Sequence, residues 1–409
     1  MTTHKAAADG GIERRNRFLP QAAAVISESC SLQGATCVAF LLLISSFHLT
    51  PFYNVHVKTW DAAIIGGGII GLSLALSLRK HGAAVLIVER NEPGREASHA
   101  AAGMLAQCDP HTPEKLRSLA MASFQLYPEF VHELEDESGQ RVDLRQEGAI
   151  VLDGDGESLC PNFQRLTPVQ LAKLEPCLAN SAKRAEFWPE GSVDPRALTA
   201  AALKAAKHRE IEIASGAPVV EIQVTHGRAS GVKTQKTHFA AAVVINCAGA
   251  WAGQIAGAPT FPTRPVKGQM LSLIAPRRDF LRHVVRGPGA YLVPRSDGRI
   301  LIGATLEEAG FDKRTDANTI QGLHQAAANL APDLGQARML EAWAGLRPGT
   351  PDRLPILGAT SLPGYFVATG HFRDGILLTP VTALVMTQVV RGAKPEFDIS
   401  AFAPARFGC

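Results

Sequence analysis

The stretch Asp61-Ala-Ala-Ile-Ile-Gly-Gly-Gly-Ile-Ile-Gly71 decides the fold of this chain. The apolar residues 62–65 predict a buried strand, and the amphipathic segment 69–81 predicts a helix after the glycine turn. The turn matches G-x-G-x-x-G through three glycines, Gly66, Gly68 and Gly71. In that motif the glycines allow a tight turn, a close approach of backbone N–H groups to a pyrophosphate, and close packing of helix on strand. The positive end of the helix would face the anion.

The residues that follow strengthen this interpretation. A second apolar run, 84–88, ends in Glu89, eighteen residues after Gly71. A carboxylate about 20 residues after the glycines accepts hydrogen bonds from an adenosine ribose, although Arg90 could instead meet a ribose phosphate. The glycine motif alone is a weak signal, because ordinary α/β crossovers contain such turns. Strand, turn, helix, strand and acid together predict a dinucleotide-binding βαβ unit.

Composition limits the class of protein. At 409 residues, with 46% hydrophobic and 19% charged residues, the chain is expected to be globular and to form two domains. A formal charge of +3, without basic clusters interleaved with aromatic residues, argues against nucleic acid as a partner. Seven cysteines without a C-x-x-C pair argue against a disulfide framework and against a zinc site, so no metal is expected. A reducing, cytoplasmic location is the simplest interpretation.

The first 57 residues differ from the rest. They are expected to be an extension that is disordered, serves in targeting, or results from a misassigned start. The apolar run Cys37–Ile44 is shorter than the roughly 18 residues that a membrane-spanning helix needs. It could be the apolar part of a signal peptide, but no clear small-residue cleavage site follows it. Membrane association is therefore not expected.

Later segments predict that the dinucleotide-binding domain is discontinuous. A helical pattern spans 113–137, and an apolar strand at 242–246 ends in small residues that would face the same crevice as the first glycine turn. Between 265 and 310 several apolar runs have the length of strands, and Ser296-Asp-Gly298 predicts a hairpin turn between two of them. Such a sheet could form the wall of a pocket over a cofactor.

Two arginines near the C-terminus are candidates for binding a carboxylate. Arg347 lies among glycines and a proline, and Arg373 precedes an apolar helix expected at 376–390. Arginine binds a carboxylate through two parallel N–H bonds. A structural ion pair is an equally good interpretation of either arginine alone.

The chain resembles the D-amino-acid oxidase family of flavoproteins, and within it the glycine oxidases of thiamine biosynthesis, over about 58–400. The resemblance rests on motifs that occur in the expected order: 66–71 with Glu89, 98–105, 265–268, 291–295, 343–350 and 370–378. It implies FAD as cofactor and Arg347 and Tyr291 as holders of the substrate carboxylate, with Arg373 beside them. It also implies FAD contacts, together with the glycine turn, from Gly66, Gly68, Ile69, Ile70, Gly71, Glu89, Arg90, Ala97, Ser98, Ala102, Gly103, Met104, Val219, His371, Phe372, Arg373, Asp374, Gly375, Ile376 and Leu377.

The expected fold is α/β, with a Rossmann-like, discontinuous FAD-binding domain and an inserted α+β substrate domain on an antiparallel or mixed sheet. The expected FAD-binding segments are 58–110, 190–257 and 338–400, and the expected substrate segments are 111–189 and 258–337. A helix beginning near Asp374 would direct its positive end at the flavin. His99 is either an ordinary loop histidine or a point of covalent flavin attachment.

The resemblance implies oxidative deamination of glycine, sarcosine and small D-amino acids, with oxygen as second substrate and hydrogen peroxide as product. It also favours a homotetramer. Two other functions fit the sequence: a D-amino-acid dehydrogenase that passes electrons to a quinone, and a flavin-binding scaffold without turnover. The sequence does not rank the small amines, because it does not fix the size of the pocket.

Overall fold

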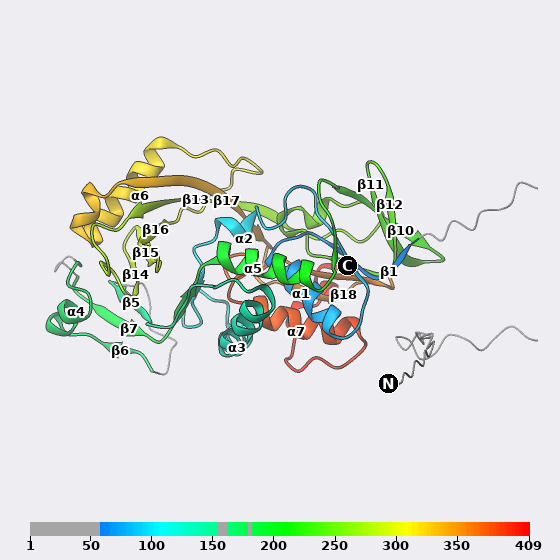
Figure 1. Cartoon of the computed structure of the whole chain (residues 1–409), viewed down its shortest axis with the longest axis horizontal. Helices are drawn as coiled ribbons and strands as arrows, with labels where there is room; N and C mark the ends of the chain where they lie inside the picture. The colour runs from blue at the N-terminus through cyan, green and yellow to red at the C-terminus, as the bar shows by residue number, and fades with distance from the viewer. Residues whose placement is uncertain (1–57, 154–161, 179–181) are drawn as a thin grey trace, which may run out of the picture. The chain divides into compact units, whose positions relative to one another are not determined.

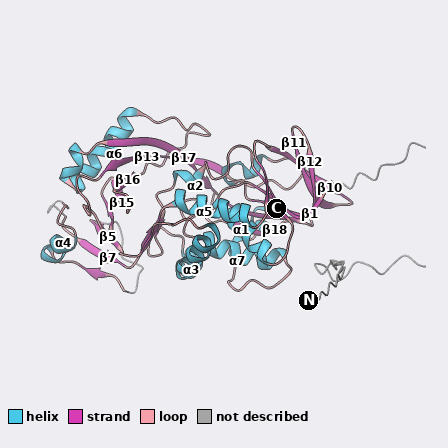
Figure 2. Ribbon diagram, in the orientation of Figure 1, coloured by secondary structure: helices cyan, strands magenta, loops and turns pink. Residues whose placement is uncertain are grey.

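The computed structural model describes residues 58–153, 162–178 and 182–409 (Figure 1). The extension expected at 1–57, with its apolar run, lies outside the described residues. Within the described ranges, strands form two large sheets and one small one, and helices pack against the large sheets (Figure 2). No helix in these ranges has both the length and the apolar character needed to cross a membrane.

The first sheet begins with the strand predicted before the glycine turn. That strand, β1 (Thr59–Ile65), lies between β2 (Val85–Val88) and β12 (His238–Asn246) and runs parallel to both. Parallel pairing continues outward to β9 (Glu212–Ala214) beside β2 and to β19 (Tyr365–Thr369) beside β12. Segments about three hundred residues apart thus share one parallel sheet.

Antiparallel strands complete this sheet. Strand β18 (Ile356–Ala359) pairs with β19, and the strands β10 (Val219–Thr225) and β11 (Arg228–Thr234) extend it beyond β12. The result is a mixed sheet with a parallel centre, typical of dinucleotide-binding domains.

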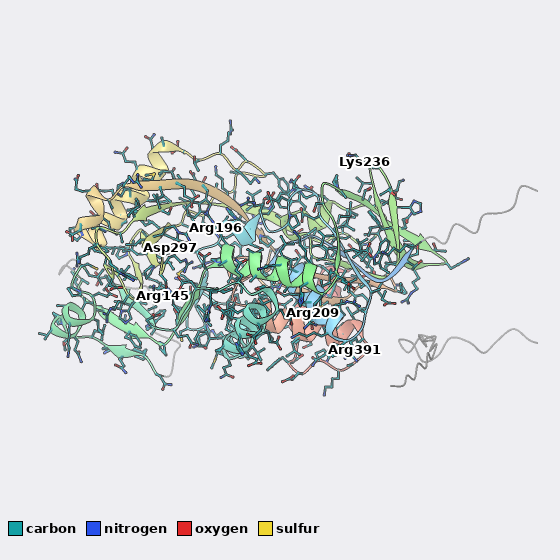
Figure 3. The ribbon with its side chains drawn as sticks, viewed as in Figure 1. Arg145, Arg196, Arg209, Lys236, Asp297 and Arg391 are labelled. Atoms are coloured by element: carbon teal, nitrogen blue, oxygen red, sulfur yellow. The ribbon has the colours of Figure 1, made fainter. Side chains whose placement is uncertain are left out.

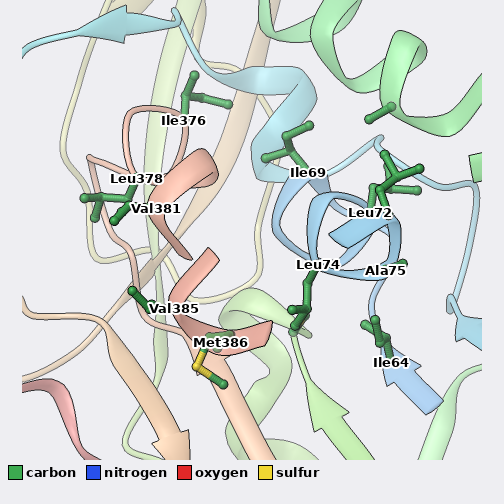
Figure 4. Close-up of a cluster of buried hydrophobic side chains, with 14 of the residues drawn as sticks. Ile64, Ile69, Leu72, Leu74, Ala75, Ile376, Leu378, Val381, Val385 and Met386 are labelled. Atoms are coloured by element: carbon green, nitrogen blue, oxygen red, sulfur yellow. The ribbon is translucent and has the colours of Figure 1, made fainter. Parts of the chain in front are cut away.

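Helices bury one face of this sheet. They are α1 (Ile69–Lys80), α3 (Glu114–Ser138), α5 (Pro195–His208) and α7 (Thr379–Val390). Figure 4 shows part of their shared core, in which Leu74 of α1 lies near Met386 of α7. Ile64 of β1, Leu72 of α1 and Val381 of α7 belong to the same buried cluster. Burying an aliphatic side chain of this size contributes about 1.5–3 kcal/mol, so this core fixes the glycine turn on its sheet.

The second sheet contains the predicted β-like region. Its strands, in spatial order, are β17 (Met339–Gly349), β13 (Arg264–Ile274), β16 (Arg299–Gly303), β15 (Ala290–Pro294), β14 (Val284–Gly287), β5 (Ala149–Leu152), β7 (Ala185–Trp188) and β6 (Gln164–Arg165). The hairpin predicted at 296–298 joins β15 to β16. Helix α6 (Ala317–Leu330) packs on this sheet through Ile320, Leu323 and Leu330.

Short elements join the two sheets. A small sheet consists of β3 (Met104–Leu105), β8 (Gly191–Val193) and β4 (Leu144–Arg145). The remaining helices are α2 (Ala97–Ala100), α4 (Pro168–Leu174) and the 3-10 turns at Gly249–Gln254, Pro332–Gln336, Ser400–Phe402 and Pro404–Phe407.

Three expectations differ from the structure. Helix α3, expected with the substrate segments, packs against α5 and α7 in the core of the first sheet, because its Leu116, Leu119 and Tyr127 are buried there. Strand β17, expected with the FAD-binding segments, pairs along β13 in the second sheet. Helix α7 begins at Thr379, where Pro380 fits the first turn, and not near Asp374.

The cysteines also differ from expectation. Cys177, Cys247 and Cys409 are free and buried, but Cys108 is disulfide-bonded. An odd cysteine count without a C-x-x-C pair therefore did not exclude a disulfide.

Candidate active site

The glycine turn has the geometry that the motif requires. Gly66 has φ of +104°, and a Cβ on it would lie 2.5 Å from the carbonyl oxygen of Cys247. A Cβ on Gly71 would lie 2.0 Å from the carbonyl oxygen of Gly66. Neither position accepts a side chain, because the atoms in the way belong to the backbone. The third glycine, Gly68, precedes the first turn of α1, where the Ile69 N–H donates to Ser98 Oγ at 3.0 Å.

Glu89 lies at the end of β2 beside this turn. Its carboxylate is 7% exposed and accepts hydrogen bonds from the Gly67 N–H at 2.7 Å and from the Asn91 N–H at 2.9 Å. Two backbone donors thus fix the carboxylate next to the motif, and its remaining lone pairs are available to a ribose.

Arg90 is held by an aromatic stack. Its guanidinium lies 4.0 Å from the centre of the Trp251 ring, and that ring stacks on Phe311 at 5.1 Å. The stack fixes a cation beside Glu89. Trp251 lies in the small-residue segment after β12, so this contact follows from the end of that strand facing the glycine turn.

A cavity of about 480 Å³ extends from the glycine turn to the second sheet. Its volume lies in the range of about 300–1,000 Å³ that ligand pockets occupy. Tyr291, Arg347 and Arg373, the predicted substrate residues, line this cavity together with most of the residues expected to contact FAD. Those that line it are Gly66, Gly68, Ile69, Ile70, Glu89, Arg90, Ala97, Ser98, Ala102, Gly103, Met104, Val219, His371, Phe372, Asp374, Gly375 and Ile376.

Two residues expected to contact FAD lie behind the wall. Gly71 faces the backbone of Gly66, and Leu377 is 1% exposed in the core shared by α1 and α7. Neither is among the residues that line the cavity. Both support the wall through packing.

His99 also lies away from the cavity lining. Its carbonyl oxygen accepts a hydrogen bond from Arg196 Nε at 3.3 Å, and Arg196 is labelled in Figure 3. Burial lowers the pKa of His99, and the charge of Arg196 lowers it further. This geometry does not favour a covalent flavin link at His99.

The substrate end of the cavity is built from side chains of the second sheet. Arg347, in β17, lies directly opposite Val266 of β13 and donates a hydrogen bond to the carbonyl oxygen of Thr305 at 3.2 Å. A Cβ on Gly268 would lie 2.2 Å from one of its guanidinium nitrogens, so that glycine makes room for the cation. Gly303 does the same for Tyr291, whose hydroxyl would lie 2.4 Å from a Cβ there.

Arg347 is a cation that has no ion-pair partner among the residues that the structure describes. Across residues 58–153, 162–178 and 182–409, no carboxylate lies within salt-bridge distance of its guanidinium. Burial lowers the pKa of Arg347, and the neighbouring charge of Arg373 lowers it further. Burial raises the pKa of Tyr291 against the opposing effects of Arg347 and Arg373, so Tyr291 keeps its proton. The pair therefore offers a charged and a neutral hydrogen-bond donor to one anion.

Arg373 has a different environment. Its guanidinium lies 3.3 Å from the carboxylate of Asp109, which also lines the cavity. Burial raises the pKa of the next residue, Asp374, to about 6, and the charge of Asp109 acts in the same direction. No sequence pattern indicates Asp109, because it lies in an irregular turn 264 residues away from its partner.

The residues at the glycine-turn end fit FAD. Glycines leave the backbone free of Cβ atoms where a pyrophosphate would approach. Ile69 and Ile70 begin the helix whose positive end would face that pyrophosphate. Glu89 is oriented for a ribose. Ala97 and Ala100–Met104 add a run of mostly small residues to the wall, against which a flat ring system can lie.

Together, the parallel sheet, the glycine turn and the cavity define a dinucleotide-binding protein. A family model described as FAD dependent oxidoreductase matches residues 61–389. The chain belongs to this family, so the predicted family, fold class and FAD cofactor are confirmed.

Among relatives, the glycine oxidase of Geobacillus kaustophilus is 34% identical over 366 residues, which cover 85% of this chain and 97% of the relative. The crystal structure of glycine oxidase from Geobacillus kaustophilus superposes with a TM-score of 0.80 and 35% identity, covering 85% of this chain and 99% of that one. The bifunctional protein ThiO/ThiG of Synechocystis is 36% identical over 85% of this chain and 54% of the relative. This chain thus spans about half the length of the bifunctional relatives that it matches.

Proposed function

We propose that this chain catalyses the FAD-dependent oxidative deamination of glycine and other small amines, such as sarcosine and small D-amino acids. The products would be an oxoacid, ammonia or an amine, and hydrogen peroxide. The observation that carries the proposal is the guanidinium of Arg347, which has no carboxylate partner among the described residues, beside the Tyr291 hydroxyl at one end of a cavity whose other end fits FAD. Relatives named glycine oxidase that match along nearly their whole length support it.

The side chains of the second sheet position the substrate. Arg347 binds the substrate carboxylate through two N–H donors, and Tyr291 donates a further hydrogen bond from its protonated hydroxyl. Both side chains are held in place by the neighbouring strands through Gly268 and Gly303. Fixing the carboxylate sets the orientation of the carbon that is oxidised.

FAD supplies the redox chemistry: when bound, it accepts two electrons from the amine and transfers them to oxygen. The protein excludes water and orients the two reactants. No side chain has to act as a general base, because the neutral amine provides the electron pair that drives the oxidation.

The resemblance to glycine oxidases of thiamine biosynthesis leads us to place the reaction in the formation of the thiazole part of thiamine. We also propose that the chain is cytoplasmic and forms a homotetramer. Light scattering on the purified flavoprotein tests the tetramer, since a monomeric or dimeric mass would contradict it. Cell fractionation tests the location.

Anaerobic mixing with glycine, sarcosine and D-alanine tests the proposed reaction. The flavin absorbance near 450 nm should bleach with at least one of these amines, and peroxide should appear once air is admitted. A yellow protein that none of them reduces would contradict the proposal. Bleaching without peroxide, but with reduction of a quinone-like dye, would indicate a dehydrogenase instead.

A further inference from the structure

The two arginines of the substrate end differ in their partners. Arg347 has no carboxylate within salt-bridge distance in the described part of the chain, whereas Arg373 pairs with Asp109 at 3.3 Å. Both arginines and Asp109 line the same cavity. Tyr291 lines this cavity as well, and the charge of Arg373 lowers the pKa of Arg347 and of Tyr291.

Asp109 is held in place by more than Arg373. Its Oδ1 accepts a hydrogen bond from the His111 N–H at 2.9 Å, and its Oδ2 lies 3.7 Å from a guanidinium nitrogen of Arg286. Arg286 is fixed in turn by Glu190 and lies 5.4 Å from the centre of the Trp188 ring. The Asp109 side chain is only 13% exposed, so its charge is screened less than that of a surface carboxylate.

The arrangement has a consequence for the charge that a substrate can carry. One carboxylate can bind Arg347 without having to compete with a carboxylate of the described residues. A second carboxylate on the same substrate, reaching toward Arg373, would meet a cation that is already paired and a fixed carboxylate of like charge. Repulsion of this kind discriminates between ligands as effectively as an added attraction does.

We propose that Asp109 restricts this site to amines with a single carboxylate by occupying Arg373 and repelling a second carboxylate. The inference deepens the proposed function and rests on it for the identity of the substrate. It assigns Asp109 as a specificity-determining residue, and Arg373 as a cation that becomes a second carboxylate site once Asp109 loses its charge.

Two acids that cannot be oxidised as amines test the proposal without turnover. Methoxyacetate has the shape of sarcosine, and diglycolate adds a second carboxylate in the way that iminodiacetate does. Their Kd values can be measured from the absorbance change of the bound flavin. Wild-type protein should bind methoxyacetate more tightly than diglycolate; equal or tighter binding of diglycolate would overturn the proposal without any variant.

The Asp109→Asn variant keeps an oxygen for the His111 N–H but removes the charge. It should strengthen the binding of diglycolate relative to methoxyacetate by roughly tenfold or more, which corresponds to the free energy of one charge-assisted hydrogen bond. Asp109→Glu, which keeps the charge, should leave the ratio near the wild-type value. A ratio for Asp109→Asn within twofold of wild type would also overturn the proposal.

Two further variants test whether the gain in affinity for diglycolate comes from Arg373 and from the loss of Asp109 in particular. When Arg373→Met is added to Asp109→Asn, the increase in affinity for diglycolate should disappear, because the guanidinium that binds the second carboxylate is no longer there. Asp352→Asn removes a different aspartate that pairs with an arginine, Arg406, outside the cavity lining, and it should not change the ratio. A gain that persists without Arg373, or that Asp352→Asn reproduces, would contradict the assignment.

Turnover measurements test the proposed reaction, whereas binding measurements test the role of Asp109, so the failure of one can be told from the failure of the other. Failure of all amines to reduce the flavin would contradict the proposed reaction and leave the Kd ratio as an independent result. If turnover occurs, the ratio of kcat/KM for iminodiacetate to that for sarcosine should rise in Asp109→Asn in parallel with the Kd ratio. The monoamide of iminodiacetate, which has the same shape and one charge fewer, should show no such rise.

Discussion

The two ends of the cavity are built in different ways. At the end that fits FAD the wall is mainly backbone around the glycine turn, with glycines where a Cβ would collide with carbonyl oxygens at 2.0–2.5 Å, and Glu89 adds a carboxylate that backbone N–H groups fix. At the substrate end they come from the long side chains of Tyr291 and Arg347, for which Gly268 and Gly303 leave space. A glycine that packs against backbone atoms tolerates almost no substitution, whereas a glycine that packs against the end of a side chain can be replaced if that side chain moves. Substitutions at the first end should therefore affect the holoprotein as a whole, and those at the second should affect the substrate alone.

The largest effect is expected for Gly71→Ala. Its Cβ would lie 2.0 Å from a backbone oxygen of the glycine turn, so either the turn or α1 must shift. We expect loss of bound FAD and a destabilisation of roughly 3 kcal/mol, measured by flavin content and urea unfolding. Gly322→Ala, in α6, meets nothing within 4 Å and should be neutral or stabilising by about 0.5–1 kcal/mol. Full flavin content in Gly71→Ala would contradict this account of the turn.

A pH effect is expected from a buried histidine of the cavity wall. His371 is buried in the cavity wall, and burial lowers its pKa from 6.5 to about 4. Between these values the unfolded chain binds the proton more readily, so His371 contributes stability that is fully present above pH 6.5 and is lost as pH falls toward 4. The loss is at most about 3 kcal/mol.

Unfolding curves of the flavoprotein between pH 4 and 8 check this expectation. His371→Gln should flatten the fall in stability below pH 6.5, whereas His238→Gln, at an exposed histidine, should not. The same acid sensitivity in all three proteins would show that His371 is not its source.

The smallest effect is expected for Gly268→Ala. The added Cβ would lie 2.2 Å from the end of the Arg347 side chain, which can move aside. We expect the KM for glycine to rise roughly tenfold through misplacement of the guanidinium, with flavin content unchanged. Gly335→Ala, whose nearest neighbour is Ala328 Cβ at 3.4 Å, serves as the control. Loss of FAD in Gly268→Ala would contradict the separation of the two ends.

The FAD end could be predicted from the sequence because its signals are local. A strand, three glycines at fixed spacing, a helix and Glu89 occur within about thirty residues, and the structure places them as expected. The start of α7 was predicted too early, because the apolar run 376–378 continues the helical pattern although these residues form a turn.

The substrate end was predicted through family resemblance and not through local patterns. Tyr291 and Arg347 come together only through the pairing of β15, β16, β13 and β17, a register that periodicity does not specify. The placement of β17 in the second sheet was missed for the same reason. Asp109 was missed altogether, since nothing near it in sequence indicates its contact with Arg373.

We expect Arg347 to bind the substrate carboxylate without contributing to the binding of FAD. The KM for glycine of Arg347→Ala, measured together with flavin content, tests this expectation. We predict a rise in KM of roughly ten- to a hundredfold, since a hydrogen bond to a charged group contributes about 1.5–3 kcal/mol, with FAD bound at the wild-type level. An unchanged KM would contradict this expectation.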